Sequence, residues 1–268
     1  MNSLDARTVA VTGGGAGIGA GVCRALASVG ADVVVLDRDI ERAESIANEI
    51  GGRAFAVDVT DEAQVDQVYG AIENLSGSVN CAGFNYIGPI VSTSLHDWRQ
   101  MTGVHLDGAF LTLRAAARSM LRNSTGGSIV NIASINGVYV HRGMAGYAAG
   151  KAGVSMLTRT AAVELAAAGI RVNAVAPGIV ETEMTRQVMS DPEVSSKWVA
   201  GIPLGRLGQP DDIAQVVAFL LGDGSRWITG ETLMVNGGAA LRVEPVVTDE
   251  SMWTVGALKD AAGAGQAE

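Results

Sequence analysis

Residues 8–19 read TVAVTGGGAGIG, and this stretch decides the fold. It begins as a short β-branched run, predicted to be a strand, and continues as a glycine-rich loop that opens a predicted helix over residues 17–28. Glycine there allows a tight turn and a close approach of the backbone to a pyrophosphate at the helix N-terminus. The pattern therefore favours a dinucleotide-binding loop, although a glycine run alone also fits an ordinary turn. The candidate cofactor residues of this loop are Gly13, Gly15, Gly17, Ile18 and Gly19.

Outward from this stretch, short β-branched runs alternate with longer amphipathic segments, as in βαβ units around a parallel sheet. We expect strands at residues 9–12, 32–37, 54–57, 79–82, 128–133, 171–176 and 232–235. Helices are expected at residues 17–28, 40–50, 62–75, 97–121, 147–168 and 211–221. The sequence thus predicts a single doubly wound α/β domain, with a seven-stranded parallel sheet flanked by helices, over residues 1–241. Residues 242–268 lack a clear period and are expected to form a tail, disordered or packed on a neighbouring subunit.

The overall charge argues against polyanionic partners. The chain of 268 residues has 19 basic and 28 acidic residues, a formal net charge of −9, which repels nucleic acid and anionic lipid. The N-terminus lacks an export signal and no apolar run reaches the roughly 18 residues of a membrane span. We expect a soluble, cytoplasmic protein, and the 48% hydrophobic content indicates an oligomer.

The cysteines and histidines show no metal-binding pattern. Cys23 and Cys81 are far apart and are predicted to be core thiols, so neither a disulfide framework nor a CxxC site is expected. His96, His105 and His141 have no metal-ligand spacing. No structural or catalytic metal is predicted.

Asp37 ends the second predicted strand 18 residues after Gly19. This is close to the spacing of about 20 residues expected for the acid that binds the ribose hydroxyls of a dinucleotide. A carboxylate there would repel a 2′-phosphate, so NAD is favoured over NADP. Arg38 is the contrary signal, since a guanidinium could bind that phosphate; the alternative is a solvated surface charge.

Tyr147 and Lys151 stand four residues apart, which places both on one face of a helix. An ammonium near a phenol favours the phenolate and would lower the tyrosine pKa from about 10, making it a usable acid or base. A YxxxK pair also occurs by chance in many helices.

Together with the glycine loop, these residues resemble the short-chain dehydrogenase/reductase family. Its TGxxxGIG, NAG, serine, YxxxK and PG motifs are matched in order over about residues 9–241, with NCAG at residues 80–83 in place of NAG. The resemblance implies a Rossmann-type fold and a catalytic set of Ser134, which binds the substrate oxygen, Tyr147, which transfers the proton, and Lys151, which binds the ribose and lowers the tyrosine pKa. It further implies cofactor contacts from Asp58, Val59, Asn80, Ala82, Gly83, Tyr147, Lys151, Pro177, Gly178, Val180 and Thr182.

The sequence departs from the family pattern at two places. His105 stands where the family usually has an asparagine that holds a backbone kink and a water linked to the lysine. An imidazole could replace it as a catalytic proton relay, although it titrates near neutral pH; the alternative is a buried neutral histidine. The polar run at residues 74–79 also suggests that the fourth strand begins late.

The sequence therefore predicts an enzyme that transfers a hydride between NAD(H) and a secondary alcohol or ketone, with Tyr147 as general acid and base. The alternatives are an NADPH-dependent 3-oxoacyl reductase and a non-catalytic NAD-binding regulator. The substrate is expected to be a small molecule that contacts residues 135–144 and a loop at about 183–207, with apolar candidates Tyr139, Met144, Met184, Val188, Met189 and Trp198. His141 and Arg142 are either surface residues or ligands for a polar or anionic substrate. The family's assembly through the two long helices implies a homotetramer.

Overall fold

The computed structural model describes residues 4–124, 126–241 and 259, and its centre is a seven-stranded sheet. The strand order is β3-β2-β1-β4-β5-β6-β7, and every neighbouring pair is parallel. The strands are β1 (Thr8–Thr12), β2 (Asp32–Asp37), β3 (Arg53–Ala56), β4 (Leu75–Asn80), β5 (Gly127–Ile132), β6 (Ile170–Pro177) and β7 (Thr232–Val235). The predicted α/β class with seven parallel strands is confirmed.

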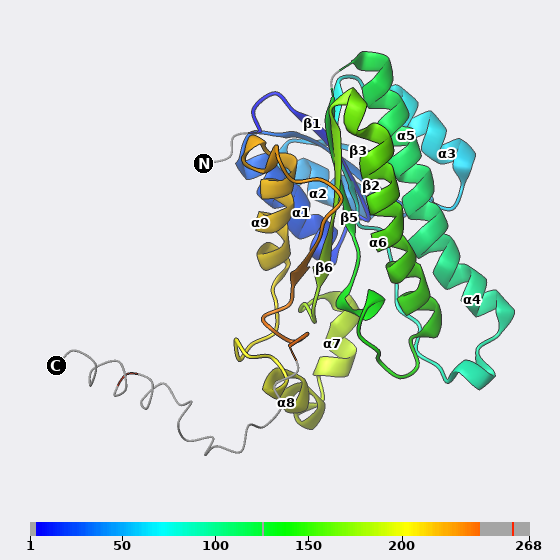
Figure 1. Ribbon diagram of the computed structural model, residues 1–268, viewed down its shortest axis with the longest axis vertical. Coiled ribbons are helices and arrows are strands. Elements are labelled where there is room, and N and C mark those ends of the chain that lie inside the picture. The colour runs from blue at the N-terminus through cyan, green and yellow to red at the C-terminus, as the bar shows by residue number, and fades with distance from the viewer. Residues whose placement is uncertain (1–3, 125, 242–258, 260–268) are drawn as a thin grey trace.

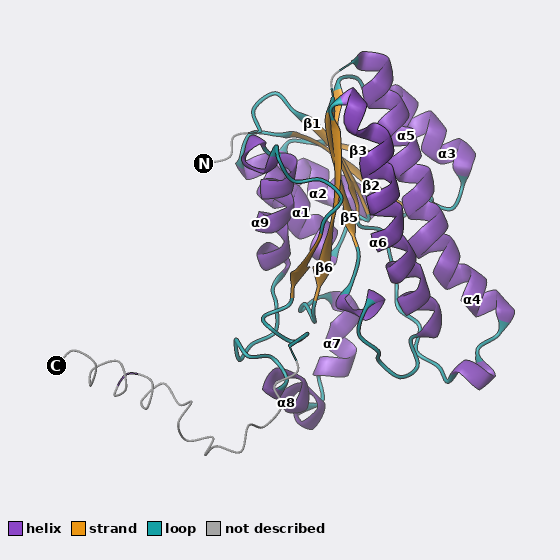
Figure 2. Cartoon of the chain, in the orientation of Figure 1, coloured by secondary structure: helices purple, strands orange, loops and turns teal. Residues whose placement is uncertain are grey.

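Helices cover both faces of the sheet (Figures 1 and 2). One face carries α1 (Gly17–Ser28), α2 (Ile40–Ile50) and α9 (Pro210–Leu221), and their apolar residues form one buried cluster with the sheet. The other face carries α3 (Glu62–Ala71), α5 (Gly108–Asn123) and α6 (Ala145–Leu165), which form a second cluster. Because successive sheet residues alternate between these clusters, the strands are buried on both faces.

The strand order reverses at β1, whose neighbours are β2 on one side and β4 on the other. In doubly wound sheets this switch point leaves a crevice at the carboxyl ends of the strands, where ligands bind. The glycine-rich loop leaves β1 at this point. The fold therefore places the motif beside the crevice.

The predicted end of the third helix and the predicted bounds of β4 are wrong. The third helix ends at Ala71 instead of residue 75, and β4 begins at Leu75 and ends at Asn80 instead of spanning 79–82. The polar run that suggested a late start lies inside the sheet, where it fits tightly. A Cβ on Gly77 would lie 2.8 Å from a Val9 methyl group, and the Ser78 hydroxyl lies 3.1 Å from the Tyr69 hydroxyl.

The helices also differ from the prediction at two places. The expected helix over residues 97–121 consists of α4 (Leu95–Thr102), a π-helical segment (Gly103–Asp107) and α5. The expected substrate loop at about 183–207 contains two short helices, α7 (Glu183–Met189) and α8 (Pro192–Ala200). Pro192 follows the capping residue Asp191, whose carboxylate accepts hydrogen bonds from the first-turn amides, and this explains why α8 begins there.

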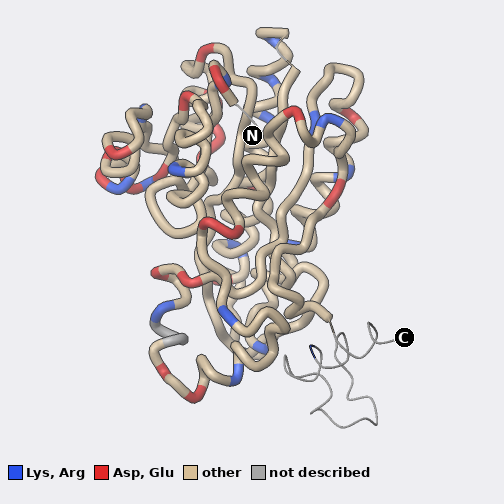
Figure 3. Tube along the Cα trace, turned by 90° about the vertical axis from the view of Figure 1, so that its left-hand side faces the viewer, with Lys and Arg blue, Asp and Glu red and all other residues tan. Residues whose placement is uncertain are grey.

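Acidic and basic residues are interspersed along the described chain (Figure 3). Within the described part, no helix is both long enough and apolar enough to span a bilayer. The predicted tail at residues 242–268 falls almost entirely outside the described residues.

Candidate active site

A cleft of about 1100 Å³ lies at the carboxyl ends of the strands, and most of the predicted site residues line it. Those that do are Gly13, Gly17, Ile18, Gly19, Asp37, Asp58, Val59, Ala82, Gly83, His105, Ser134, Tyr147, Lys151, Pro177, Gly178, Val180 and Thr182. Gly15 and Asn80 do not line this cleft. The structure thus brings together residues that are up to 169 positions apart, from Gly13 to Thr182.

The glycine loop leaves no room for larger residues. Gly13 has a positive φ of 64°, and a Cβ on it would lie 2.8 Å from the Ala82 Cα. A Cβ on Gly19 would collide with the carbonyl oxygen of Gly13. The helix that follows has no side-chain cap at Ala16 and no acid in its first turn. Its first amides are therefore available to an anion, and the loop fits the pyrophosphate of a dinucleotide.

Asp37 lies at the end of β2 and is fixed by backbone amides. Its Oδ2 accepts a hydrogen bond from the Gly15 amide at 3.0 Å, and its Oδ1 accepts one from the Asp39 amide at 3.1 Å. Gly15 therefore orients the carboxylate instead of lining the cleft. Arg38 also lines the cleft, whereas Arg42 is paired with Glu183 at 2.9 Å and with Asp39 at 3.2 Å.

Thr12, which the sequence reasoning missed, holds the loop after β4. It is buried, and its hydroxyl accepts hydrogen bonds from the amides of Cys81 at 3.1 Å and Ala82 at 3.3 Å. Its only signal in the sequence is a polar residue at the end of an apolar strand. Asn80 donates to the Asn131 side chain at 2.7 Å and so links β4 to β5.

Ser134, Tyr147 and Lys151 meet at one end of the cleft. Ser134 follows β5, and its hydroxyl accepts a hydrogen bond from the Asn136 amide at 3.1 Å. Tyr147 and Lys151 lie in the first two turns of α6. The Lys151 ammonium donates to the Ile132 carbonyl at 2.6 Å and lies 5.8 Å from the centre of the Tyr147 ring.

The pKa of Tyr147 is raised in the structure and not lowered as the resemblance implies. Burial raises the pKa of Tyr147, and a hydrogen bond from the Ser134 side chain offsets part of that shift. Burial also lowers the pKa of Lys151 to about 8. Desolvation is thus the largest cause of both shifts.

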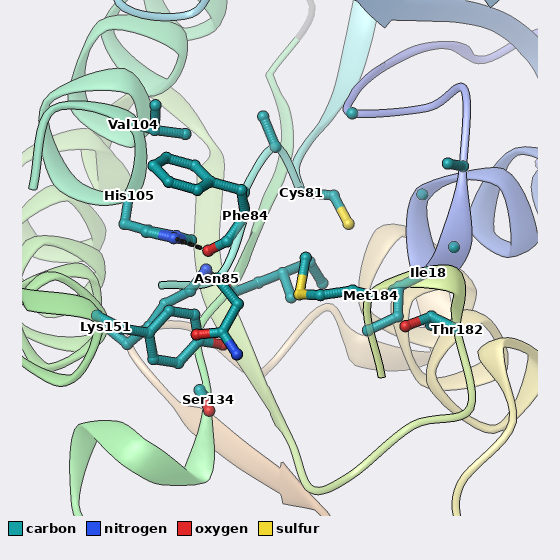
Figure 4. A pocket seen from close by; sticks show the side chains of 18 of the residues that line it. Ile18, Cys81, Phe84, Asn85, Val104, His105, Ser134, Lys151, Thr182 and Met184 are labelled. Carbon is teal, nitrogen blue, oxygen red and sulfur yellow. Dashed lines mark hydrogen bonds between the residues drawn. The ribbon is translucent and has the colours of Figure 1, made fainter. Parts of the chain in front are cut away.

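His105 lies in the π-helical segment and is 2% exposed. Its Nε2 lies 2.8 Å from the Phe84 carbonyl oxygen (Figure 4), so Nε2 carries the proton and donates it. Its ring contacts Tyr147 edge to face, with centroids 4.8 Å apart. Burial lowers the pKa of His105 to about 3. His105 is therefore buried, and its pKa lies well below neutral pH.

Two buried acceptors beside Lys151 have no hydrogen-bond partner among the described residues: His105 Nδ1 and Asn80 Oδ1. Both residues, together with Lys151, line a small cavity of about 10 Å³ behind the main cleft. This volume is close to that of a single water-sized probe sphere. The ammonium, which uses one of its three protons on Ile132, thus borders a space with two free acceptors.

The outer part of the cleft contains both expected and missed residues. Met144, Met184, Trp198 and His141 line it as predicted or allowed, whereas Tyr139 and Arg142 do not. The side chains of Val188 and Met189 lie outside what the structure describes. The sequence reasoning missed the polar lining by Asn85, His96, Arg99 and Gln100, whereas Asn136 lies within the predicted stretch 135–144. Cys23 is a core thiol as predicted, but Cys81 lies on the cleft with its sulfur turned toward it (Figure 4).

Across the described residues, no group of three or more histidine, cysteine or acidic side chains is arranged to hold a metal ion.

Comparisons with known proteins identify the family of the chain. Residues 13–240 match the family model described as enoyl-(acyl carrier protein) reductase. The chain is 38% identical over 243 residues to galactitol 2-dehydrogenase (L-tagatose-forming) of Cereibacter sphaeroides, with 88% of this chain and 95% of that protein covered. It is 39% identical over 255 residues to the human (3R)-3-hydroxyacyl-CoA dehydrogenase, with 89% and 97% covered.

A similar solved structure is a gluconate 5-dehydrogenase from Burkholderia cenocepacia in complex with NADP and tartrate. The TM-score is 0.86 and the identity 34%, with 90% of this chain and 98% of that chain covered. The chain therefore belongs to the short-chain dehydrogenase/reductase family of oxidoreductases.

Proposed function

We propose that the protein is a dehydrogenase that oxidises a secondary alcohol, or reduces the corresponding ketone, with NAD as the preferred cofactor. The observation that carries this proposal is the meeting of Ser134, Tyr147 and Lys151 at one end of a cleft that begins at the glycine loop. When bound, the nicotinamide accepts the hydride from the carbinol carbon or returns it.

The protein's part in the reaction is to bind the substrate oxygen and move its proton. The Ser134 hydroxyl is oriented by the Asn136 amide and binds the substrate oxygen beside the phenol. During oxidation Tyr147 takes the proton from the substrate hydroxyl as its C–O bond becomes a carbonyl, and during reduction it returns that proton. Lys151 stabilises the phenolate that oxidation requires, because its ammonium lies beside the same ring.

His105 is proposed to support this proton transfer from behind. Its Nδ1 carries no proton in this tautomer and has no hydrogen-bond partner among the described residues, and His105 and Lys151 both line the small cavity. The geometry favours a relay in which the neutral imidazole accepts a hydrogen bond, directly or through water, from the groups that return a proton to Lys151. An imidazolium relay is disfavoured, because burial keeps the pKa of His105 near 3.

The NAD preference rests on Asp37. Its amide-fixed carboxylate lines the cleft at the end of β2, where it would accept hydrogen bonds from ribose hydroxyls and repel a phosphate. The main argument for NADP is Arg38, which lines the same end of the cleft, together with the NADP bound to the similar gluconate 5-dehydrogenase. The proposal weighs the fixed carboxylate above the exposed guanidinium.

The second candidate function is an NADPH-dependent 3-oxoacyl reductase. It is supported by the likeness to a 3-hydroxyacyl-CoA dehydrogenase and by the cationic Arg38. The non-catalytic regulator is disfavoured because all three residues of the catalytic set line the cleft.

The test measures the absorbance of the reduced cofactor with a panel of secondary alcohols, polyols and 3-hydroxyacyl thioesters, each with NAD and with NADP. The proposal expects turnover of at least one alcohol with a higher kcat/KM for NAD. Tyr147→Phe, which keeps the ring and removes the proton-transferring oxygen, should abolish turnover. Turnover of thioesters alone with NADP would favour the second candidate, and no turnover in either direction would contradict the proposal.

A further inference from the structure

One wall of the cleft runs from the catalytic serine to α8 through an unbroken set of contacts. The Asn136 amide donates to the Ser134 hydroxyl at 3.1 Å, and the Asn136 side-chain oxygen lies 2.6 Å from His141 Nδ1. The His141 ring then stacks on Trp198, with centroids 5.1 Å apart and planes at 29°. All four residues line the cleft. A single residue, Asn136, thus connects His141 to Ser134, the residue that binds the reacting oxygen.

These contacts fix which nitrogen of His141 carries the proton. The side-chain Nδ2 of Asn136 donates to the Met144 sulfur at 3.3 Å, and this orients the side-chain oxygen of Asn136 toward His141. A carbonyl oxygen only accepts, so His141 Nδ1 must donate to it. Nε2 is then left with a lone pair and has no hydrogen-bond partner among the described residues. Partial burial lowers the pKa of His141 and so favours this neutral form.

A neutral acceptor in this position selects by chemistry. It attracts a hydroxyl group, which donates a hydrogen bond, and it repels a carboxylate, which only accepts. A purely alkyl substrate would cover the nitrogen without pairing it, and an unpaired buried acceptor is costly. Asn85, which lines the same cleft, adds an amide that both donates and accepts (Figure 4).

We propose that the cleft takes a polyhydroxylated substrate, a sugar alcohol or its ketone, and that His141 is the residue that selects it by accepting a hydrogen bond at Nε2 from a second substrate hydroxyl. This inference rests on the proposed dehydrogenase function. Trp198 on α8 holds the imidazole plane, and Asn136 holds its tautomer.

The test compares kcat/KM for galactitol and sorbitol with kcat/KM for a secondary hexanol, which has the same carbon chain and one hydroxyl. The wild-type enzyme should prefer the hexitols. His141→Phe keeps a ring on Trp198 and removes the acceptor, so kcat/KM for the hexitols should fall about tenfold or more, with little change for the hexanol. His141→Gln restores an acceptor and should recover part of the loss. Val140→Ala, on the same loop but exposed and outside the cleft, should change neither.

The outcomes separate the two proposals. A wild-type enzyme that oxidises the hexanol at least as well as the hexitols overturns the inference and leaves the dehydrogenase proposal intact. An equal loss for both substrates in His141→Phe also overturns it, because the residue would then be structural. An enzyme that oxidises none of these alcohols with either cofactor, and no other member of the wider alcohol panel, contradicts the dehydrogenase function itself.

Discussion

Asp37 and Arg38 are adjacent, oppositely charged and on the same end of the cleft, so they pull cofactor choice in opposite directions. Replacing Asp37 with alanine removes the repulsion of a 2′-phosphate and should narrow the NAD preference. The expected change in the ratio of kcat/KM for the two cofactors is roughly tenfold, the scale of a charge pair near a protein surface. Arg38→Ala is the matched control, because it should move the ratio toward NAD. A higher kcat/KM for NADP in the wild type would sink the preference.

The role of His105 is open to a kinetic test at the same scale. If its Nδ1 serves the proton relay, His105→Ala should lower kcat by about 10²-fold, the range of a lost proton transfer. The affinity for NAD, measured by fluorescence titration, should change less. His105→Asn should restore much of the rate, because an amide also accepts. An unchanged kcat and pH profile in His105→Ala would show that the imidazole only packs.

Burial of His105 also makes a prediction about stability. Its folded pKa lies near 3, below the ordinary value of about 6.5, so below pH 6.5 the unfolded chain binds a proton that the folded chain excludes. The free energy of unfolding therefore decreases as the pH falls. Relative to His105→Asn, the wild type should lose about 2 kcal/mol of unfolding free energy between pH 7 and pH 5. Denaturant titrations at both values measure this, and parallel losses in the two proteins would contradict it.

Some residues of the site could be predicted from the sequence, and others could not. The resemblance located Ser134, Tyr147 and Lys151, because their motifs are local. Thr12, by contrast, is functional through two amides almost 70 positions away, and Asn136 through its contact with His141. Such roles depend on which segments the fold places side by side. The pKa shifts of His105 and Tyr147 could not be predicted from the sequence for the same reason, because burial in the fold is the largest cause of both.

At the scale of elements, the periodicity of the sequence predicted most boundaries. It failed where tertiary packing, and not local pattern, determines which residue types fit. The predicted bounds of α1, β2, α2 and β7 agree with the structure, because each is an apolar or amphipathic run with clear ends. In β4 the serines and the glycine looked like a loop, yet the space beside Val9 and Tyr69 admits only small side chains. The π-helical segment at Gly103–Asp107 interrupts a helical pattern without any proline to mark it.

The tight packing of β4 predicts the cost of enlarging Gly77. A Cβ there would lie 2.8 Å and 3.1 Å from the two methyl groups of the buried Val9. Gly77→Ala should therefore lower the unfolding free energy by about 1–3 kcal/mol, the range of core overpacking. Gly70→Ala is the control, since its Cβ would meet nothing within 4 Å and alanine favours the helix by about 1 kcal/mol. Equal stabilities of the two variants would show that the strand has room to spare.

At the scale of the molecule, the exposed faces of α5 and α6 argue for assembly into a homotetramer. The two helices lie side by side on one face of the sheet (Figure 1). On α6, Met156 and Val163 are 59% and 81% exposed and stand two turns apart on one side of the helix. On α5, Phe110 and Leu121 are 44% and 49% exposed and repeat after three turns. Exposed apolar side chains on two neighbouring helices are typical of an interface between copies.

Light scattering of the native protein at micromolar concentration should give four times the chain mass. Val163→Glu places a charge in the proposed interface without entering the core, because Val163 is exposed in the single chain. It should shift the mass toward dimers or monomers while the circular dichroism spectrum is retained. Ala71→Glu adds the same charge at an exposed position on α3, outside the exposed faces of α5 and α6, and should leave the tetramer intact. A monomeric mass for the wild type would refute the assembly, and a tetrameric Val163→Glu would move the interface away from α6.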